Sequence, residues 1–443
     1  MSGYGLTRTF VFLLCGLAAH PAVSTAGGYR VLAYFPGGTY VGPAGIMEET
    51  PGIFYALSTA NGVISVTAKG TFTTFATFQD PPDVVISAPT PAANKRIYSS
   101  VNYGGSGPHA NVFSVGQTTG TEQIYASEPL SPGLAGNVPS GSLFGIACPV
   151  GVAGACSFAF INTQGVLTPF YQFPSTDMLS QPIYGSDGNY YGTGYTFGVA
   201  STYLYQLTPG GSFSKIVVMP FSGGGFVGAG LVLQGSDGNY YGIQQTGGGC
   251  SSANQHGAVY KVTPSGQFSI LHDFGVCGKA IVNALIQASD GNLYGAIQGT
   301  GALFRLTTSG EYKELFHTTN GSTEGLCPCW LLQGSNGQIY GMAQGGGPHG
   351  DGVLFALDLG LPAPAPQQLV FSPASGAVGT KVRIWGRNLL SATAQFNGLA
   401  ATDVYNSGPN YVWATVPPGA TTGPITITTP GGTATTSTSF TVE

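Results

Sequence analysis

A short motif returns four times in this chain, and its spacing constrains the fold more than any other feature. It reads Ser-Asp-Gly-Asn-Tyr-Tyr-Gly around Asp187 and Asp237, and it returns in variant form around Asp290 and Asn336. The acid position recurs after 50, 53 and 46 residues. A period near 50 is typical of propeller arrays, in which each repeat is one small sheet that cannot bury its faces alone.

The repeat around Asp237 predicts four strands separated by tight turns. The expected strands are Leu231–Gln234, Tyr240–Gln244, Gly257–Thr263 and Gln267–Phe274. Asp-Gly and Pro-Ser-Gly sequences between them favour tight turns. Four strands and three turns are the content of one propeller blade. The pattern also fits the neighbouring repeats, and it fits the first three units weakly.

The last unit ends after the strand Val353–Leu357 and lacks a fourth strand. Tyr29–Phe35 has the fourth-strand pattern of Tyr312–Phe316 and Phe268–Phe274. We therefore expect the N-terminal strand to complete the last blade, which would remove an exposed edge. This predicts a seven-bladed β-propeller, with six or eight blades as alternatives because the first units are weakly marked.

The sequence divides into four parts. Residues 1–26 read as a signal peptide, because Arg8 precedes the short apolar run Phe10–Ala19 and small residues end at Ala26. Residues 27–360 are the propeller repeats, and residues 361–367 are a Pro/Ala linker. Residues 368–443 alternate as short strands and predict an immunoglobulin-like β-sandwich. The expected fold class is all-β.

Export is the expected localisation, either secreted or at the cell surface. No later stretch is apolar over the length that a membrane helix needs, so we expect no membrane span in the mature chain. Six cysteines follow the leader, and an even number in an exported chain favours disulfides. The candidates are Cys148, Cys156, Cys250, Cys277, Cys327 and Cys329. Cys148 with Cys156 is the best pair, Cys250 with Cys277 is second, and Cys327-Pro328-Cys329 leaves a metal site as an alternative to a disulfide.

Composition excludes one class of partner and suggests another. Lys and Arg total 13 and are scattered, which argues against nucleic acid, since binding to it requires clustered cations. Charged residues are 7% of the chain, against about 25% in an ordinary protein. The surface is therefore rich in hydroxyl, amide and tyrosine groups, which suit a glycan or a cell-surface protein. We expect a monomer without a cofactor.

Two groups of residues are candidates for chemistry. Asp187, Asp237 and Asp290 are predicted to be turn residues, because a calcium loop would need more oxygen ligands at alternate positions. His109, His256 and His349, with Asp351, fall in loops expected at one rim of the ring. They form a ligand or metal rim in one interpretation and ordinary surface histidines in the other.

The repeats from about residue 180 to 357 resemble the Gloeo-Verruco tandem repeat of exported bacterial proteins. That resemblance implies export and a propeller-like fold, without assigned catalytic residues. The C-terminal segment resembles an IPT/TIG domain through Ser372–Gly376, Gly379–Val382, Gly386–Leu389, Phe396–Gly398 and Thr422–Ile425. TIG domains act as spacers or protein-binding units on bacterial surfaces, and this is what the resemblance implies here.

These observations favour an exported, non-catalytic binding or surface-scaffold protein. The alternative is a secreted polysaccharide lyase or glycoside hydrolase with its active site on the propeller. A glycosidase would need two carboxylates about 5 to 9 Å apart. The sequence contains no nucleophile elbow, zinc-protease or phosphate-loop motif, and we therefore expect binding rather than catalysis.

Overall fold

The computed structural model shows an all-β fold. It describes residues 28–443 except for 36–44, 59–61, 77–83, 86–87, 104–108, 117–121, 126–132, 148–155, 163, 165, 197–200, 220–231, 245–256, 275–281, 298–299 and 319–320. Besides strands, these residues form the short helix α1 (Gly321–Glu324) and the 3-10 helix η2 (Gly408–Asn410). No helix in the described ranges has the length and hydrophobicity to cross a membrane.

Seven antiparallel sheets of four or five strands precede the linker in the described residues. The first contains β2 (Ile46–Thr50), β3 (Ile53–Ser58), β4 (Gly62–Thr67) and β5 (Phe72–Ala76). The second contains β6 (Val84–Val85), β7 (Thr90–Pro91), β8 (Arg96–Tyr103), β9 (His109–Gly116) and β10 (Glu122–Tyr125). The third contains β11 (Gly133–Asn137), β12 (Leu143–Ala147), β13 (Ser157–Ile161) and β14 (Leu167–Gln172).

The remaining four sheets carry the clear repeats. The fourth contains β15 (Asp177–Leu179), β16 (Ile183–Tyr184), β17 (Tyr190–Thr196), β18 (Ser201–Leu207) and β19 (Phe213–Met219). The fifth contains β20 (Val232–Gln234), β21 (Tyr240–Gln244), β22 (Ala258–Val262) and β23 (Phe268–Asp273). The sixth contains β24 (Val282–Gln287), β25 (Leu293–Ile297), β26 (Ala302–Leu306) and β27 (Tyr312–His317). The seventh contains β28 (Leu326–Gln333), β29 (Ile339–Gly345), β30 (Val353–Leu357) and β1 (Tyr29–Tyr34).

The predicted pairing of the two chain regions in the last sheet is confirmed. β1 lies antiparallel to β30, with Tyr29 opposite Leu357 and Tyr34 opposite Val353. Tyr29 is buried, its ring stacks on Phe316 at 3.8 Å, and its hydroxyl donates to the Glu324 carbonyl at 2.5 Å. The N-terminal strand therefore supplies backbone bonds and a buried side chain to the last sheet.

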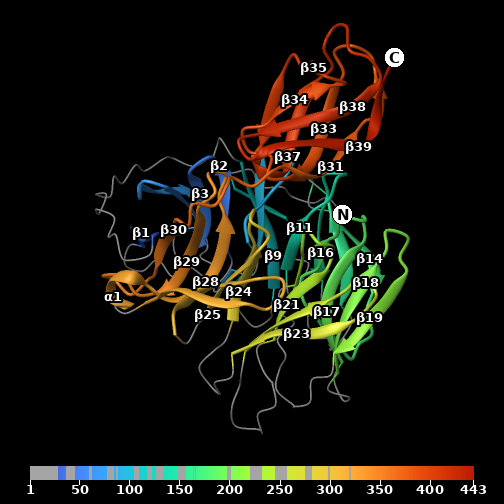
Figure 1. The fold of residues 1–443 in the computed structure, drawn as a ribbon. Helices are drawn as coiled ribbons and strands as arrows, with labels where there is room; N and C mark the ends of the chain where they lie inside the picture. Colours follow the sequence, from blue (N-terminus) through green and yellow to red (C-terminus); the bar gives the residue numbers. More distant parts are fainter. Residues whose placement is uncertain are drawn as a thin grey trace.

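Hydrophobic clusters join consecutive sheets and also join the seventh sheet to the first. In that last junction Phe54 of β3 packs on Tyr340 of β29, with ring centroids 4.3 Å apart. A similar cluster joins each of the remaining pairs of sheets that follow one another along the chain. The seven sheets thus form a closed, propeller-like ring (Figure 1), in which no sheet buries its core alone.

The repeated Asp-Gly-Asn motif forms the turn that was predicted. Asp237 accepts hydrogen bonds from the backbone and side-chain nitrogens of Asn239 and from the Tyr241 hydroxyl, at 3.1, 2.7 and 2.6 Å. Gly238 has φ +80°, a conformation that glycine adopts without strain. Burial alone would raise the pKa of Asp237, but these hydrogen bonds and Lys261 outweigh it and lower the pKa. The carboxylate of Asp237 therefore stabilises the turn in its charged form.

Each of these turns is also held by the next sheet. The amides of Ser186, Ser236 and Ser289 donate to the side-chain oxygens of Gln234, Gln287 and Gln333, at 2.7 to 2.8 Å. At the junction of the seventh and first sheets, the Ser335 amide donates to Glu48 at 2.6 Å. Glu48 thus takes the place of the repeat glutamine at the junction that closes the ring.

The C-terminal residues form a separate two-sheet unit. One sheet has the order β31 (Gln367–Ser372), β33 (Lys381–Arg387), β37 (Tyr411–Thr415), β36 (Val404–Ser407). The other has the order β32 (Ser375–Gly376), β39 (Gly432–Val442), β38 (Gly423–Thr429), β34 (Thr393–Phe396), β35 (Leu399–Ala400). One apolar cluster that includes Ile384, Phe396 and Phe440 fills the space between them. Figure 1 shows this unit, in red, standing on one end of the ring.

Candidate functional site

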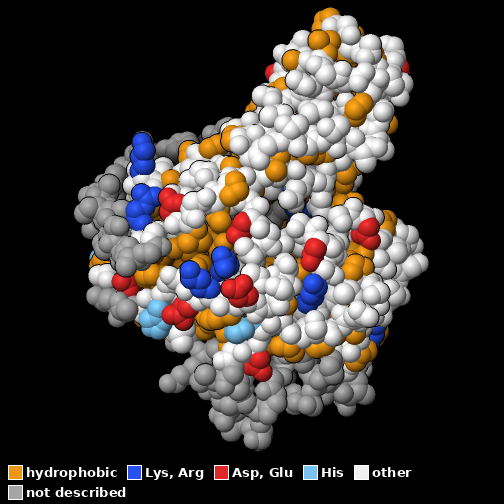
Figure 2. Space-filling view, in the orientation of Figure 1, with side chains coloured by type: hydrophobic (Ala, Val, Ile, Leu, Met, Phe, Trp, Pro, Cys, Tyr) orange, Lys and Arg blue, Asp and Glu red, His pale blue; other side chains and the backbone are white. Residues whose placement is uncertain are grey.

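A cleft lies between the C-terminal unit and the end of the ring that carries the Asp-Gly-Asn turns. It consists of two cavities of about 380 and 950 Å³. Both are lined by Leu332, Gln333, Pro364, Arg387, Asn388 and Gly431. Figure 2 shows the hollow between the two units. We call the two cavities together the interface cleft.

The linker and the strands β33, β36 and β37 of the C-terminal unit hold that unit over the ring. The Arg383 guanidinium donates to the Pro139 carbonyl at 3.0 Å, and the buried Tyr411 hydroxyl donates to the Val138 carbonyl at 3.2 Å. On the linker side, Ser289 donates to the Pro362 carbonyl at 2.6 Å. The unit is therefore fastened on two sides, and the cleft lies between these attachments.

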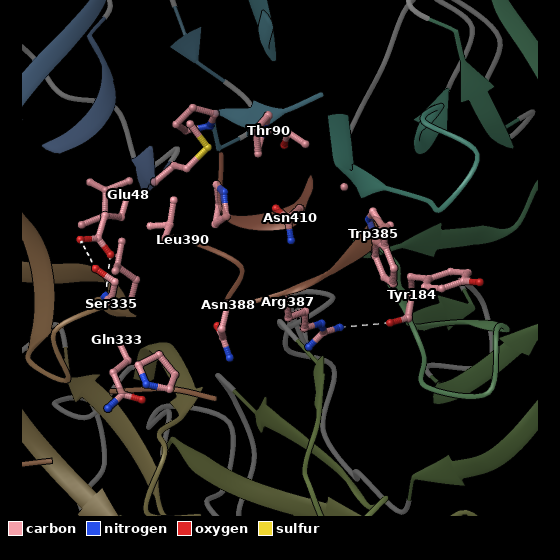
Figure 3. A pocket seen from close by; sticks show the side chains of 18 of the residues that line it. Glu48, Thr90, Tyr184, Gln333, Ser335, Trp385, Arg387, Asn388, Leu390 and Asn410 are labelled. Atoms are coloured by element: carbon pink, nitrogen blue, oxygen red, sulfur yellow. Dashed lines mark hydrogen bonds between the residues drawn. The ribbon is translucent and has the colours of Figure 1, made fainter. Parts of the chain in front are cut away.

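Arg387 is the cation of the cleft. It lies at the end of β33, and its guanidinium donates to the Tyr184 carbonyl at 3.1 Å. Burial lowers the pKa of Arg387, because removing water penalises the charged form. None of the described carboxylates forms an ion pair with it. The other guanidinium N–H groups can therefore face a ligand (Figure 3).

Aromatic and amide groups surround this cation. Trp385 and Tyr184 meet edge to face with centroids 5.3 Å apart, so the C-terminal unit and the fourth sheet share one end of the smaller cavity. Asn388 donates to the Ala365 carbonyl at 2.9 Å, and Asn410 donates to the Gly386 carbonyl at 3.0 Å. Each amide is held by its nitrogen, which leaves its oxygen as an acceptor toward a ligand.

The two carboxylates on the cleft wall are already engaged. Glu48 accepts from the Ser335 amide and hydroxyl and from the Gly52 amide at 2.7 Å. Asp290 accepts from the Asn292 backbone and side chain and from the Tyr294 hydroxyl. Both carboxylates therefore stabilise turns of the ring, and neither is available as a general acid or base.

Two residues of the predicted histidine rim lie at the other end of the seventh sheet, away from its Asn-Gly turn. His349 is exposed and Asp351 is half-buried, in the loop that joins β29 to β30. His109 lies in β9 and its side chain is outside the described part, as is all of His256. No cluster of metal-ligating side chains occurs among the described residues. Neither His349 nor Asp351 lines the interface cleft, and the role of the four residues as a rim stays a prediction.

The cysteines give one correction. Cys329 was a disulfide candidate, but it is a reduced, buried thiol whose sulfur donates to the Met342 carbonyl at 3.5 Å. Cys156 is in a disulfide whose partner lies outside the described residues. The other four candidates, Cys148, Cys250, Cys277 and the side chain of Cys327, also fall outside them.

Sequence reasoning missed the residues of the cleft. Trp385, Arg387 and Asn388 lie within the segment that resembles a TIG domain, and Tyr184 replaces the glutamine found at Gln234 in the next repeat. This departure from the repeat is a signal that could have drawn attention to Tyr184. The docking of the C-terminal unit over that turn could not be read from local patterns.

Comparisons with known proteins agree with this architecture. The sequence profile of the Gloeobacter/Verrucomicrobia repeat matches residues 178–371. No curated protein sequence matches the chain. A streptogramin B lyase structure is similar with a TM-score of 0.54 at 13% identity, covering 74% of this chain and 97% of that one.

A catalytically inactive virginiamycin B lyase from Staphylococcus aureus with quinupristin is similar with a TM-score of 0.54 at 13% identity. The match covers 75% of this chain and all of the other. At this identity the likeness concerns the fold alone. The chain therefore carries a tandem repeat similar to the Gloeobacter/Verrucomicrobia repeat, in a propeller-like all-β fold.

Proposed function

We propose that this chain is an exported, non-catalytic glycan-binding protein whose ligand lies in the interface cleft. In this proposal the ring is a seven-bladed propeller, and the C-terminal unit is an immunoglobulin-like sandwich of the IPT/TIG type. The seven sheets joined in a closed circuit of hydrophobic clusters support the first assignment. Two sheets around one core, together with the motif resemblance, support the second.

The lining of the cleft carries the functional proposal. The larger cavity is lined by neutral amide and hydroxyl side chains, among them Gln234, Gln287, Ser186 and Ser236. Such groups exchange hydrogen bonds with sugar hydroxyls, and aromatic faces or edges pack on sugar rings. Tyr184, which meets the buried Trp385 edge to face, provides the aromatic surface in the adjoining cavity. A short saccharide chain lying across both cavities fits this distribution.

Binding is favoured over hydrolysis by the state of the cleft acids. Glu48 and Asp290 each accept three hydrogen bonds from the protein. A hydrolase needs a pair of carboxylates that face the scissile bond. A secreted lyase or hydrolase with its active site elsewhere on the ring is the competing function, and it would use the histidine rim.

A glycan array with the mature protein tests the proposal. Ser186→Trp places a bulky ring in the larger cavity, and Ser309→Trp is the matched control at an exposed turn serine that lines neither cavity. We expect glycan binding to be lost in Ser186→Trp and retained in Ser309→Trp. Product release from polysaccharides that disappears in His349→Ala would support the enzyme instead.

A further inference from the structure

We propose that Arg387 recognises a carboxylate on the ligand, so that the preferred ligand is a saccharide containing uronic acid rather than a neutral one. This inference rests on the proposed glycan-binding function and narrows it to one class of ligand. Three observations carry it: the guanidinium lies in the cleft, it donates to the Tyr184 carbonyl, and the described residues supply no carboxylate to pair with it.

The position of Arg387 places it in reach of any ligand in the cleft. It lines both cavities, and it lies where the smaller and larger cavities share their walls. In Figure 3 Arg387 lies beside Trp385 and Tyr184, and Glu48 and Ser335 lie on the opposite wall. A ligand that crosses from one cavity to the other therefore passes the guanidinium.

The hydrogen bonds of Arg387 leave most of its capacity unused. A guanidinium has five N–H donors arranged as a planar fork that matches a carboxylate. Arg387 donates to the Tyr184 carbonyl, and the carboxylates of the cleft wall are occupied by Ser335, Gly52 and the turn of Asp290. The protein therefore supplies no counter-charge to this cation from the described residues.

The energetics of burial make a carboxylate the favoured partner. A charge that is withdrawn from water is costly unless it is paired and hydrogen-bonded. A bidentate carboxylate supplies both the opposite charge and two acceptors. A neutral hydroxyl supplies one acceptor and no charge, so it compensates the partly buried cation less well.

A second polar group of the cleft, the side-chain oxygen of Gln368, is placed to accept a hydrogen bond from a ligand. The side-chain oxygen of Gln368 is buried in the wall of the larger cavity and has no hydrogen-bond partner among the described residues. It is an acceptor and matches the hydroxyl of a sugar, as the oxygens of Asn388 and Asn410 do. One cation among neutral acceptors fits a polyhydroxylated acid better than a purely apolar acid.

The test compares short oligogalacturonates with their fully methyl-esterified forms by titration calorimetry. The ester keeps the sugar rings and removes the charge. We expect the wild-type protein to bind the acid at least tenfold more tightly than the ester. Arg387→Gln should weaken acid binding about 10- to 100-fold, as expected for a charge-assisted hydrogen bond, and leave ester binding within about twofold. Arg387→Lys should recover part of the loss, because it keeps the charge without the fork.

The matched control is Lys381→Gln, which removes an exposed cation from the same strand outside both cavities. It should leave acid binding unchanged. Equal binding of acid and ester by the wild type would overturn the role of Arg387 while leaving glycan binding intact. An equal loss of acid and ester binding in Arg387→Gln would also overturn it, since that pattern means a deformed cleft. Binding of neither form nor of any other saccharide would reject the glycan-binding function itself.

Discussion

Glu48 shows how one side chain can complete a repeating structure. It accepts the Ser335 amide as the repeat glutamines accept theirs, and it is buried. Glu48→Ala should lower the free energy of unfolding by about 1 to 3 kcal/mol, because buried donors lose their acceptor. Glu48→Gln should cost less, since its amide oxygen reproduces the acceptor found at Gln287. Chemical denaturation measures both, and an equal cost for the two variants would contradict the proposed equivalence.

Glu49 should make stability depend on pH. It is buried beside Gly408 of the C-terminal unit, one of its oxygens has no partner among the described residues, and burial raises its pKa to about 8. Between its ordinary pKa and about 8 the folded chain holds a proton that the unfolded chain releases, so rising pH favours unfolding. The expected slope is about 1.4 kcal/mol per pH unit.

Denaturation at several pH values in this window measures that slope. Glu49→Gln should flatten it, because an amide does not titrate. Tyr55, whose pKa burial raises to about 12 with a contribution from Glu49, stays neutral throughout and does not mask the effect. A slope that persists unchanged in Glu49→Gln would assign the pH dependence to other groups.

At the residue scale, the sequence predicted a residue's role correctly where that role depends on neighbours in the chain. An Asp-Gly-Asn turn is stabilised by its own backbone and side chains, and Asp187 was correctly predicted as a turn residue. Arg387 was missed, because its importance arises from a contact with Tyr184, which lies in another sheet. Cys329 was assigned wrongly, since an even count of cysteines says nothing about which thiols face one another.

At the scale of the element, β1 stabilises the seventh sheet through a buried side chain as well as through backbone pairing. Tyr29→Ala should lower the free energy of unfolding by about 3 to 5 kcal/mol, the range for loss of a buried aromatic ring. Tyr29→Phe keeps the stack on Phe316 and loses the hydrogen bond to Glu324, so about 1 kcal/mol is expected. Thermal denaturation distinguishes the two. A small effect of Tyr29→Ala would mean that β30 does not need its outer partner.

Strand prediction succeeded for the outer strands and failed for several inner ones. Tyr29–Phe35 was predicted from its pattern, and its pairing with β30 is present. β2 and β11 begin the first and third sheets, β7 pairs with β8 in the second, and none of the three was predicted. β2 carries Glu48 and Glu49, β7 contains Pro91, and β11 contains two glycines. Their sequences lack β-propensity, and the neighbouring strands and sheets impose the conformation.

At the scale of the whole molecule, docking of the C-terminal unit should depend on Arg383. Its guanidinium reaches the Pro139 carbonyl and lies over the Trp413 ring, 5.8 Å from the centroid. Arg383→Ala should shift the docking equilibrium toward an open form by about tenfold, the equivalent of one charge-assisted hydrogen bond. Small-angle scattering should then show a larger radius of gyration. Lys381→Ala, an exposed neighbour on β33, is the control and should leave the radius unchanged.

The pairing of β1 with β30 also bears on how the chain acquires its structure. β1, the first of the described strands, has its partner near the end of the repeat array, with Tyr34 opposite Val353. A contact so distant along the chain forms slowly, because a long loop must close before the contact can form. Until β30 has been made, the N-terminal strand has no place to dock, and the growing chain exposes an unpaired edge. Chaperone protection of that segment during synthesis would then keep its edge from pairing with another chain.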